Sequence, residues 1–443
     1  ERAVVLAGEL DEKIEDGFVT VRRVEPRAKK RKSLGPVKSV HDERIATLIE
    51  LMNARARTSE NQPSLRYVQD VEERLNLAVS PRHHLIFGRR GVGKTALVLE
   101  AKRSLENQGK YVLWVNMHPL RGLDSKDAFL TVASRICDLG IGVFRGGGVM
   151  PASVSLLESA RSMVEQQRYD ERSTLEKSSS LVPILQQAIS RFCLESQHPV
   201  YIFLDDIHYL PTTQVPQFLD LLHGITRDNP VWLKVAGIQH QTRWFIPSPP
   251  TGLQTGHDAA IINLDVTLEH PERAKQFLQD VLRGYVDECD ASPFSSFLSV
   301  PAVDRLVLAS GGVPRDFLTL CAASLQTARQ RTNAKTVGVQ DVNNAAGTAA
   351  QIKLQELEDD AAAEIGRSEN LVSTLDRISD FLLNEKQITF FRVDFRDKES
   401  QATEYRLLQA LADLRMLHLI YASLSDPHRA GRRSEVYLLD LSQ

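Results

Sequence analysis

Residues 84–99 read HLIFGRRGVGKTALVL, and this stretch determines the expected fold. Within it, Gly88 to Thr95 match the phosphate-binding pattern G-x-x-x-x-G-K-[ST] at every specified position. The apolar run before the glycines is typical of a buried strand, and the apolar run after Lys94 is typical of a helix start. A strand, a glycine-rich loop and a helix in this order predict backbone N–H groups that hold phosphate at the helix N-terminus.

The residue types in this loop suit a nucleotide with its metal ion. The glycines allow a tight backbone path, the Lys94 ammonium can reach the β- and γ-phosphates, and the Thr95 hydroxyl can ligate Mg²⁺. The residues expected to contact the nucleotide are Gly88, Arg89, Arg90, Gly91, Val92, Gly93, Lys94, Thr95 and Ala96. The alternative interpretation is a glycine-rich turn with a solvated lysine. The strand and helix around the loop favour nucleotide binding.

Composition limits the class of protein. The chain of 443 residues suggests about three domains, and 42% hydrophobic residues are enough for sizeable cores. The formal net charge is −3, so any nucleic-acid binding would require local basic patches. The four cysteines lack metal-ligand spacing and are expected to be free thiols in a reducing cytoplasm. We expect no membrane span, because no run of about 18 apolar residues occurs.

Strand and helix patterns alternate from Leu65 to about Asp265. Continuous apolar runs separated by helical patterns indicate a doubly wound α/β fold, a parallel sheet covered on both faces with its ligand at the carboxyl ends of the strands. The strands expected after the loop are Tyr111–Asn116, Val200–Asp206, Val231–Ile238 and Ala260–Leu264. The glycine-rich stretch 140–148 and the polar stretch 153–180 are expected to be looser.

The remaining segments suggest flanking domains. Residues 1–60 contain an acidic stretch and a basic run over 22–32, and are expected to be an arm or linker. The nucleotide-binding core should span 61–266, and a purely helical pattern predicts a lid over 267–358. In 368–443, helical patterns precede two β-type runs, which suggests a small winged-helix domain.

Two adjacent carboxylates, Asp205 and Asp206, end the apolar run that begins at Val200. The carboxyl ends of parallel strands meet at one edge of the sheet, where ligands collect. There Asp205 can hold Mg²⁺ through its water shell, together with Thr95. Asp206 can then orient and polarise the attacking water.

This order of motifs resembles AAA+ ATPases of the origin-recognition-complex-type branch. The resemblance covers roughly Leu65 to the C-terminus, and includes the lid sequence Gly-Gly-Val-Pro-Arg that ends at Arg315. The residue pattern of the strand 231–236 is also similar to that of the corresponding strand in bacterial ATPases of this branch, which are found in mobile elements and phage defence. The resemblance implies a helical lid, a C-terminal winged helix, and ATP or ADP bound with Mg²⁺.

The resemblance also implies roles for single residues. A polar sensor after the strand 231–238 would contact the γ-phosphate or the water; Gln239 is the first choice, with His240 and Thr242 as alternatives. Arg315 would be the lid cation that reaches the nucleotide phosphates. An arginine finger supplied by a neighbouring subunit would be Arg243, with Arg227 as the second candidate.

The chain departs from the family pattern at one point. Family members usually have Asp-Glu where this chain has Asp205-Asp206, so the second carboxylate is one methylene shorter, or about 1.5 Å. We therefore expect slow hydrolysis, which suits a molecular switch. The rival function is a DNA-binding or scaffold module that holds ATP or ADP structurally, without useful turnover.

Partners are expected from the same resemblance. A site completed by a neighbour implies a homo-oligomer, or a complex with an effector protein. The basic loop 426–433 of the winged helix and the basic N-terminal run could contact DNA phosphates. The helix that would enter the DNA groove is neutral in charge balance, so docking to a protein is the alternative.

Overall fold

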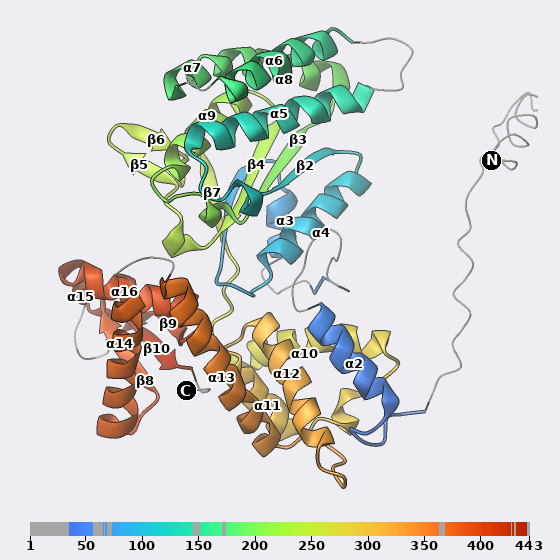
Figure 1. Cartoon of the computed structure of the whole chain (residues 1–443), viewed down its shortest axis with the longest axis vertical. Coiled ribbons are helices and arrows are strands. Elements are labelled where there is room, and N and C mark those ends of the chain that lie inside the picture. Colours follow the sequence, from blue (N-terminus) through green and yellow to red (C-terminus); the bar gives the residue numbers. More distant parts are fainter. Residues whose placement is uncertain are drawn as a thin grey trace, which may run out of the picture.

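The computed structural model describes residues 35–55, 65, 67–68, 73–144, 151–170, 174–362, 368–426, 428 and 431–440. Figure 1 shows three groups of elements, namely an α/β core, a helical group and a C-terminal group of helices and strands. The basic run over 22–32 lies outside the described residues. No described helix is long and apolar enough to cross a membrane.

The core is built on five parallel strands in the order β2-β3-β4-β1-β7. They are β1 (His83–Phe87), β2 (Tyr111–Asn116), β3 (Val200–Asp205), β4 (Val231–Gly237) and β7 (Ala259–Asn263). The predicted doubly wound parallel sheet is confirmed, and every predicted strand agrees with the observed one to within one residue at each end. The sheet brings the ends of β1 and β3 to one edge, which positions the site described below.

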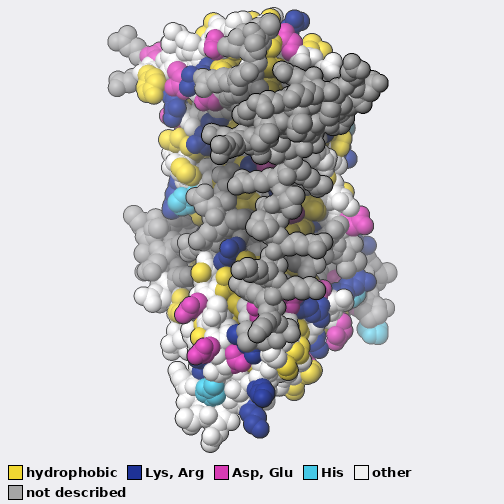
Figure 2. All heavy atoms as spheres, turned by 90° about the vertical axis from the view of Figure 1, so that its right-hand side faces the viewer, with side chains coloured by type: hydrophobic (Ala, Val, Ile, Leu, Met, Phe, Trp, Pro, Cys, Tyr) yellow, Lys and Arg dark blue, Asp and Glu magenta, His cyan; other side chains and the backbone are white. Residues whose placement is uncertain are grey.

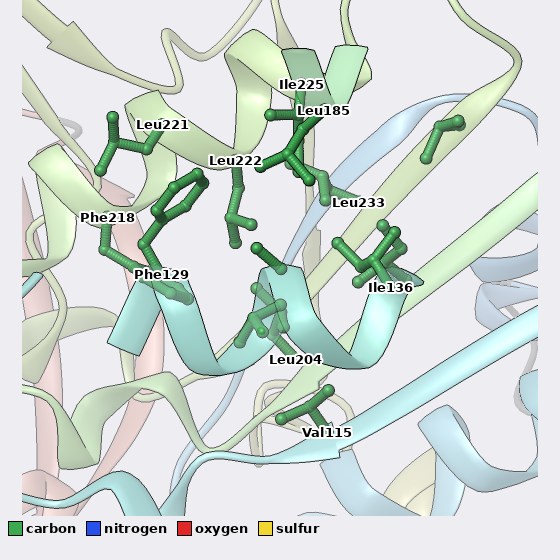
Figure 3. Packing of buried hydrophobic residues seen from close by; sticks show 14 of the residues in the cluster. Val115, Phe129, Ile136, Leu185, Leu204, Phe218, Leu221, Leu222, Ile225 and Leu233 are labelled. Carbon is green, nitrogen blue, oxygen red and sulfur yellow. The ribbon is translucent and has the colours of Figure 1, made fainter. Parts of the chain in front are cut away.

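Helices cover both faces of this sheet (Figure 1). β3 is buried at all six positions, and its side chains alternate between the two faces. Leu204 packs with residues from α5, α8 and α9 in Figure 3, whereas Phe203 packs on the opposite face with residues from α3 and α4. The covering helices are α3 (Arg74–Val79), α4 (Lys94–Asn107), α5 (Ser125–Phe144), α8 (Leu181–Ser196) and α9 (Val215–Thr226).

A helical insertion occupies the stretch that the sequence predicts to be looser. Two helices lie in this stretch, α6 (Ala152–Tyr169) and α7 (Leu175–Ser179), so the expectation of a loose polar segment is wrong. The helix α6 packs against α5 and α8 through one buried apolar stripe. That stripe consists of Val154, Leu157, Ala160 and Val164. Gly140 permits the close approach, because a Cβ there would lie 2.6 Å from Leu157 Cδ1.

The helical group adjoins the core and has its own hydrophobic cluster. It contains α10 (Pro271–Glu288), α11 (Val300–Ala309), α12 (Pro314–Arg329) and α13 (Val339–Ala362). The helix α2 (Glu43–Ala54) joins them, although it precedes the core in sequence (Figure 1). Its residues Ile45, Leu48 and Met52 are buried in the same cluster. The expected N-terminal arm therefore contributes a packed helix to the lid.

The C-terminal group combines helices with a small antiparallel sheet in the order β8-β10-β9. In chain order its elements are α14 (Ser368–Ser379), the π-helix η5 (Asp380–Lys386), β8 (Phe390–Asp394), α15 (Phe395–Ser400), α16 (Ala402–Asp413), β9 (Leu417–Ser425) and β10 (Arg433–Leu439). The two helical patterns and the terminal hairpin agree with the sequence prediction. The strand β8 and the short helix α15 are additional elements that the periodicity did not indicate.

Candidate nucleotide site

The glycines of the loop between β1 and α4 are dictated by geometry. Gly91 and Gly93 have φ angles of 85° and 104°, which side chains rarely adopt. A Cβ on Gly88 would lie 2.7 Å from Val92 Cγ2. The loop therefore follows the tight path that the sequence predicts, and α4 begins at Lys94 directly after it.

Lys94 is turned back onto the loop from which it comes. Its Nζ donates to the carbonyl oxygens of Gly88 (2.8 Å) and Arg89 (3.1 Å). Burial lowers the pKa of this ammonium, while the negative charges of Asp206 and Asp265 raise it. The buried ammonium of Lys94 thus lies where a phosphate-binding loop needs a cation.

The Thr95 side chain lies near the carboxylate of Asp205 and acts to lower its pKa, against the larger effect of burial. Asp205 is only 2% exposed, and its Oδ1 has no hydrogen-bond partner within the described residues. Burial, together with the neighbouring charge of Asp206, raises the pKa of Asp205 to about 7. A buried, unsatisfied oxygen beside a hydroxyl is the kind of donor set that Mg²⁺ prefers. The residues present therefore fit a magnesium ion.

Asp206 leaves the line of β3 because its backbone is left-handed, with φ 61° and ψ 45°. Its carboxylate lines the cavity and lies 3.9 Å from Nδ1 of His208. Burial lowers the pKa of His208 to about 3, and the charge of Lys94 adds to this effect. The neighbouring imidazole is therefore neutral and does not compensate the charge of Asp206, which acts instead on the Lys94 ammonium.

A cavity of about 510 Å³ between the core and the lid is lined by Lys94, Thr95, Asp206 and His208, whereas Asp205 is not among its lining residues. This volume lies within the range of small-molecule sites. Residues 90–97 of the loop and helix line one side. The ends of β2 and β3 contribute Asn116 and Asp206. The lid contributes an apolar wall that includes Phe277, Val281 and Leu318.

Arg315 stands at the boundary between the loop and the lid. It lines the cavity, and its backbone N–H donates to the Gly91 carbonyl oxygen (3.3 Å). A Cβ on Gly91 would lie 3.0 Å from Arg315 Cβ. The lid arginine singled out in the sequence is therefore brought directly to the phosphate loop.

Not all of the expected site residues come together. Gln239 opens the short helix η3 (Gln239–Gln241) after β4 and is not among the residues that line the cavity. Arg243 is exposed before the hairpin β5 (Phe245–Pro247) and β6 (Pro250–Gly252). Gly88 and Arg89 also lie outside the lining, and the Arg89 side chain points away from it.

Sequence reasoning missed two polar residues at the cavity. Asn116 ends β2, pairs in register with Asp205, and lines the cavity. His118 follows it, and its ring packs edge-on against Tyr209, with 4.4 Å between ring centroids. The signal was present, because Tyr111–Asn116 is an apolar strand with a polar last residue, as Val200–Asp205 is.

Comparison with known proteins agrees with this geometry. Residues 66–233 match the family model of the AAA ATPase domain. No protein among the curated sequences matches the chain. One similar structure is Orc1 of Aeropyrum pernix in complex with DNA, at 17% identity and a TM-score of 0.40, covering 85% of this chain and 91% of that one. Another is the RuvB Holliday junction branch migration motor of Thermotoga maritima, at 15% identity and a TM-score of 0.35, covering 83% and 95%. Residues 66–233 are thus similar to an AAA ATPase domain, and the five-stranded parallel sheet with its phosphate loop has the fold of a P-loop AAA+ core.

Proposed function

We propose that the chain binds ATP with Mg²⁺ and hydrolyses it slowly, as an AAA+ molecular switch. One observation carries this proposal: Thr95, in the first turn of α4, lies near Asp205, at the end of β3, beside the buried Lys94. Together they provide a cation for the phosphates and oxygen ligands for a metal ion. The AAA ATPase domain match over 66–233 supports the same function.

Each residue of the site has a proposed role. The N–H groups of the loop and the Lys94 ammonium bind the phosphates, and Thr95 and Asp205 hold the metal ion. Mg²⁺, when bound, would neutralise charge that develops on the phosphate oxygens. Asp206 orients the attacking water by accepting its hydrogen bond. Arg315 reports the state of the phosphates to the lid, because its backbone is bonded to Gly91.

Completion of the site by a second copy is part of the proposal. Arg243 is exposed, so it is available as an arginine finger for a neighbouring subunit. Gln239 serves as the sensor if a movement of η3 brings it to the cavity. Turnover per chain should then rise with protein concentration, because a shared site requires its neighbour.

The C-terminal group is proposed to be a winged helix that controls a DNA or protein partner. Its element order of helix, strand, two helices and hairpin is the basis for this proposal. At the surface of this group, Arg432 pairs with Asp394 at 3.6 Å, so an acid of the same group already neutralises this cation. This pairing favours a protein partner over a DNA duplex. On the side of the molecule that faces away from this group, Figure 2 shows basic and acidic side chains interspersed over the described part. The resemblance to mobile-element and phage-defence ATPases is the basis for proposing that setting.

A second function, structural nucleotide binding without turnover, is favoured by two observations. Asp206 is one methylene shorter than the glutamate usual in the family, and Gln239 does not line the cavity. Purified Asp206→Asn protein separates the two functions. Under the switch proposal it binds ATP like the unmodified chain and loses at least about 100-fold in phosphate release. Unmodified protein that binds ATP and releases no phosphate would establish the structural role instead.

Nucleotide binding itself is tested with Lys94→Ala. Loss of the buried ammonium should weaken ATP binding by at least about 100-fold, which corresponds to about 3 kcal/mol. Isothermal titration with MgATP measures the change. Lys102→Ala is the matched control, because Lys102 is on the same helix and pairs with Glu106. An unchanged affinity of the Lys94 variant would refute the proposed site.

A further inference from the structure

The Arg89 side chain leaves the phosphate loop on the side away from the cavity and enters a buried polar contact. Its Nε donates to Asp265 Oδ1 (3.2 Å), and its Nη1 lies 3.2 Å from His418 Nδ1 on β9. Its Nη2 donates to the carbonyl oxygens of Gly311 and Val266, each at 3.4 Å. Arg89 is only 6% exposed. One residue of the loop is thus bonded to the core, the lid and the C-terminal group.

The hydrogen bonds fix the protonation of His418. A guanidinium can only donate, so His418 Nδ1 must accept from Arg89. The proton is therefore on Nε2, which donates to Asp440 Oδ2 at 3.2 Å. Burial lowers the pKa of His418, which agrees with a neutral ring. This imidazole therefore links Arg89 to Asp440, the residue that follows β10.

The contact continues as a buried chain of charges. Asp440 accepts from Lys353 Nζ (2.5 Å), and Lys353 lies 3.6 Å from Asp316 at the start of α12. Asp316 is paired in turn with Arg415, which follows α16. This series of contacts therefore runs from the phosphate loop to the C-terminal group, on to the lid, and back to the C-terminal group at Arg415.

A negative charge of the C-terminal group also faces the phosphate loop. Asp413, the last residue of α16, is 3% exposed, and its Oδ2 has no hydrogen-bond partner among the described residues. It lies within electrostatic reach of Lys94, Arg89 and Arg90, and burial together with Asp265 raises its pKa to about 7. The helix α16 also packs against η3. The C-terminal group therefore presents an acid to the cations that phosphate would use.

Gly311, which belongs to the lid sequence that ends at Arg315, lies directly beside this contact. A Cβ on Gly311 would lie 2.1 Å from His418 Nδ1, and Gly311 has a φ of 56°. The ring of His418 therefore occupies the space beside this glycine. Only glycine at this position lets the C-terminal group approach so closely.

We propose that Arg89, His418, Asp440 and Asp413 form a latch that docks the C-terminal group onto the phosphate loop, and that nucleoside triphosphate binding and latch opening favour each other. The inference rests on the proposed function. Lys94 Nζ holds the Arg89 carbonyl, while the Arg89 side chain holds His418. A phosphate that draws Lys94 into the cavity removes the bond that holds Arg89, and its charge repels Asp413. Linkage then requires that an open latch raises the affinity for triphosphate.

The test uses the full chain with Mg²⁺ and the slowly hydrolysed analogue ATPγS. Asp413→Asn keeps the shape of the side chain and removes its charge, so it should bind MgATPγS at least about five-fold more tightly, the low end of typical coupling. Glu404→Gln is the matched control, because it removes one charge from an exposed position on the same helix. His418→Leu, which removes the acceptor of Arg89, is the second variant and should change affinity in the same direction.

Hydrogen–deuterium exchange reports the latch itself. Amides over 402–425 should exchange faster in the unmodified chain with MgATPγS, and in His418→Leu without any nucleotide. If the unmodified chain binds MgATPγS while exchange over 402–425 and the affinity of Asp413→Asn both stay unchanged, the latch is refuted and the nucleotide site stands. If neither the unmodified chain nor any variant binds MgATPγS, the proposed function fails and the latch fails with it.

Discussion

The apolar face of the sheet and the contact between phosphate loop and C-terminal group are both buried, but opposite kinds of side chain build them. Between β3 and the helices α5, α8 and α9, Leu204 and its neighbours are hydrophobic and almost without exposure (Figure 3). At the contact, Arg89, His418, Asp440 and Lys353 are buried and joined by hydrogen bonds.

This difference assigns different tasks to the two regions. An apolar face gains free energy only while it stays out of water, so it holds the core permanently together. Buried ion pairs gain little over their hydrated partners, because desolvation offsets most of their attraction. The second region can therefore open at low cost, whereas the first cannot.

Leu204→Ala should give the largest effect and test the permanence of the apolar face. Loss of a fully buried leucine leaves a cavity, so the free energy of unfolding should fall by about 2–5 kcal/mol. Urea denaturation followed by circular dichroism measures the fall. Leu194→Ala, at a position 70% exposed on α8, is the control and should cost less than about 0.5 kcal/mol. Equal losses in both variants would remove the distinction between buried and exposed apolar positions.

Asp440→Asn tests whether the polar contact can open without unfolding the core. The amide cannot neutralise Lys353, so docking of the C-terminal group should weaken by about 1–3 kcal/mol. Hydrogen exchange over 417–425 should rise, and exchange in β3 should not change. Asp394→Asn makes the same substitution at the surface pair with Arg432. Faster exchange in β3 as well would mean that the two regions unfold as one unit.

Lys234→Met should give the smallest change in the free energy of unfolding. Lys234 is a fully buried lysine on β4. Burial lowers the pKa of Lys234 to about 7, whereas an unfolded lysine has a pKa of about 10.4. Between these values the unfolded chain holds a proton that the native chain does not, so stability rises with pH. From pH 8 to 9, the unmodified chain should gain about 1 kcal/mol relative to the variant in urea denaturation. Parallel curves for the two proteins would show that Lys234 keeps its ordinary pKa.

Elements with strong local signals could be predicted from the sequence. The core strands are continuous apolar runs, and each was predicted to within one residue at each end. The insertion helix α6 was missed because only five of its eighteen residues are buried, and one of these is a serine, so its apolar pattern is weak. Its burial depends on α5 and α8, which close over it, and a local pattern cannot show that.

In the candidate site, too, the features with a local sequence signal could be predicted and the contacts between distant residues could not. The phosphate loop and Asp205 were readable because their residue types are fixed by phosphate and metal chemistry. The contact from Arg89 to His418 spans 329 positions, so nothing local to either residue could indicate it. Gly311, which belongs to the lid sequence that ends at Arg315, lies against the ring of His418 from the C-terminal group, and no local pattern could indicate that.

The central claim is that Thr95 and Asp205 hold one metal ion against a triphosphate. A crystal structure of the full chain grown with Mn²⁺ and ATPγS tests it most directly, because Mn²⁺ gives an anomalous signal at its own position. The account predicts a single strong peak within ligand distance of the Thr95 hydroxyl, with Asp205 bound directly or through one water. Nucleotide density in the cavity with the peak away from both residues would contradict the account.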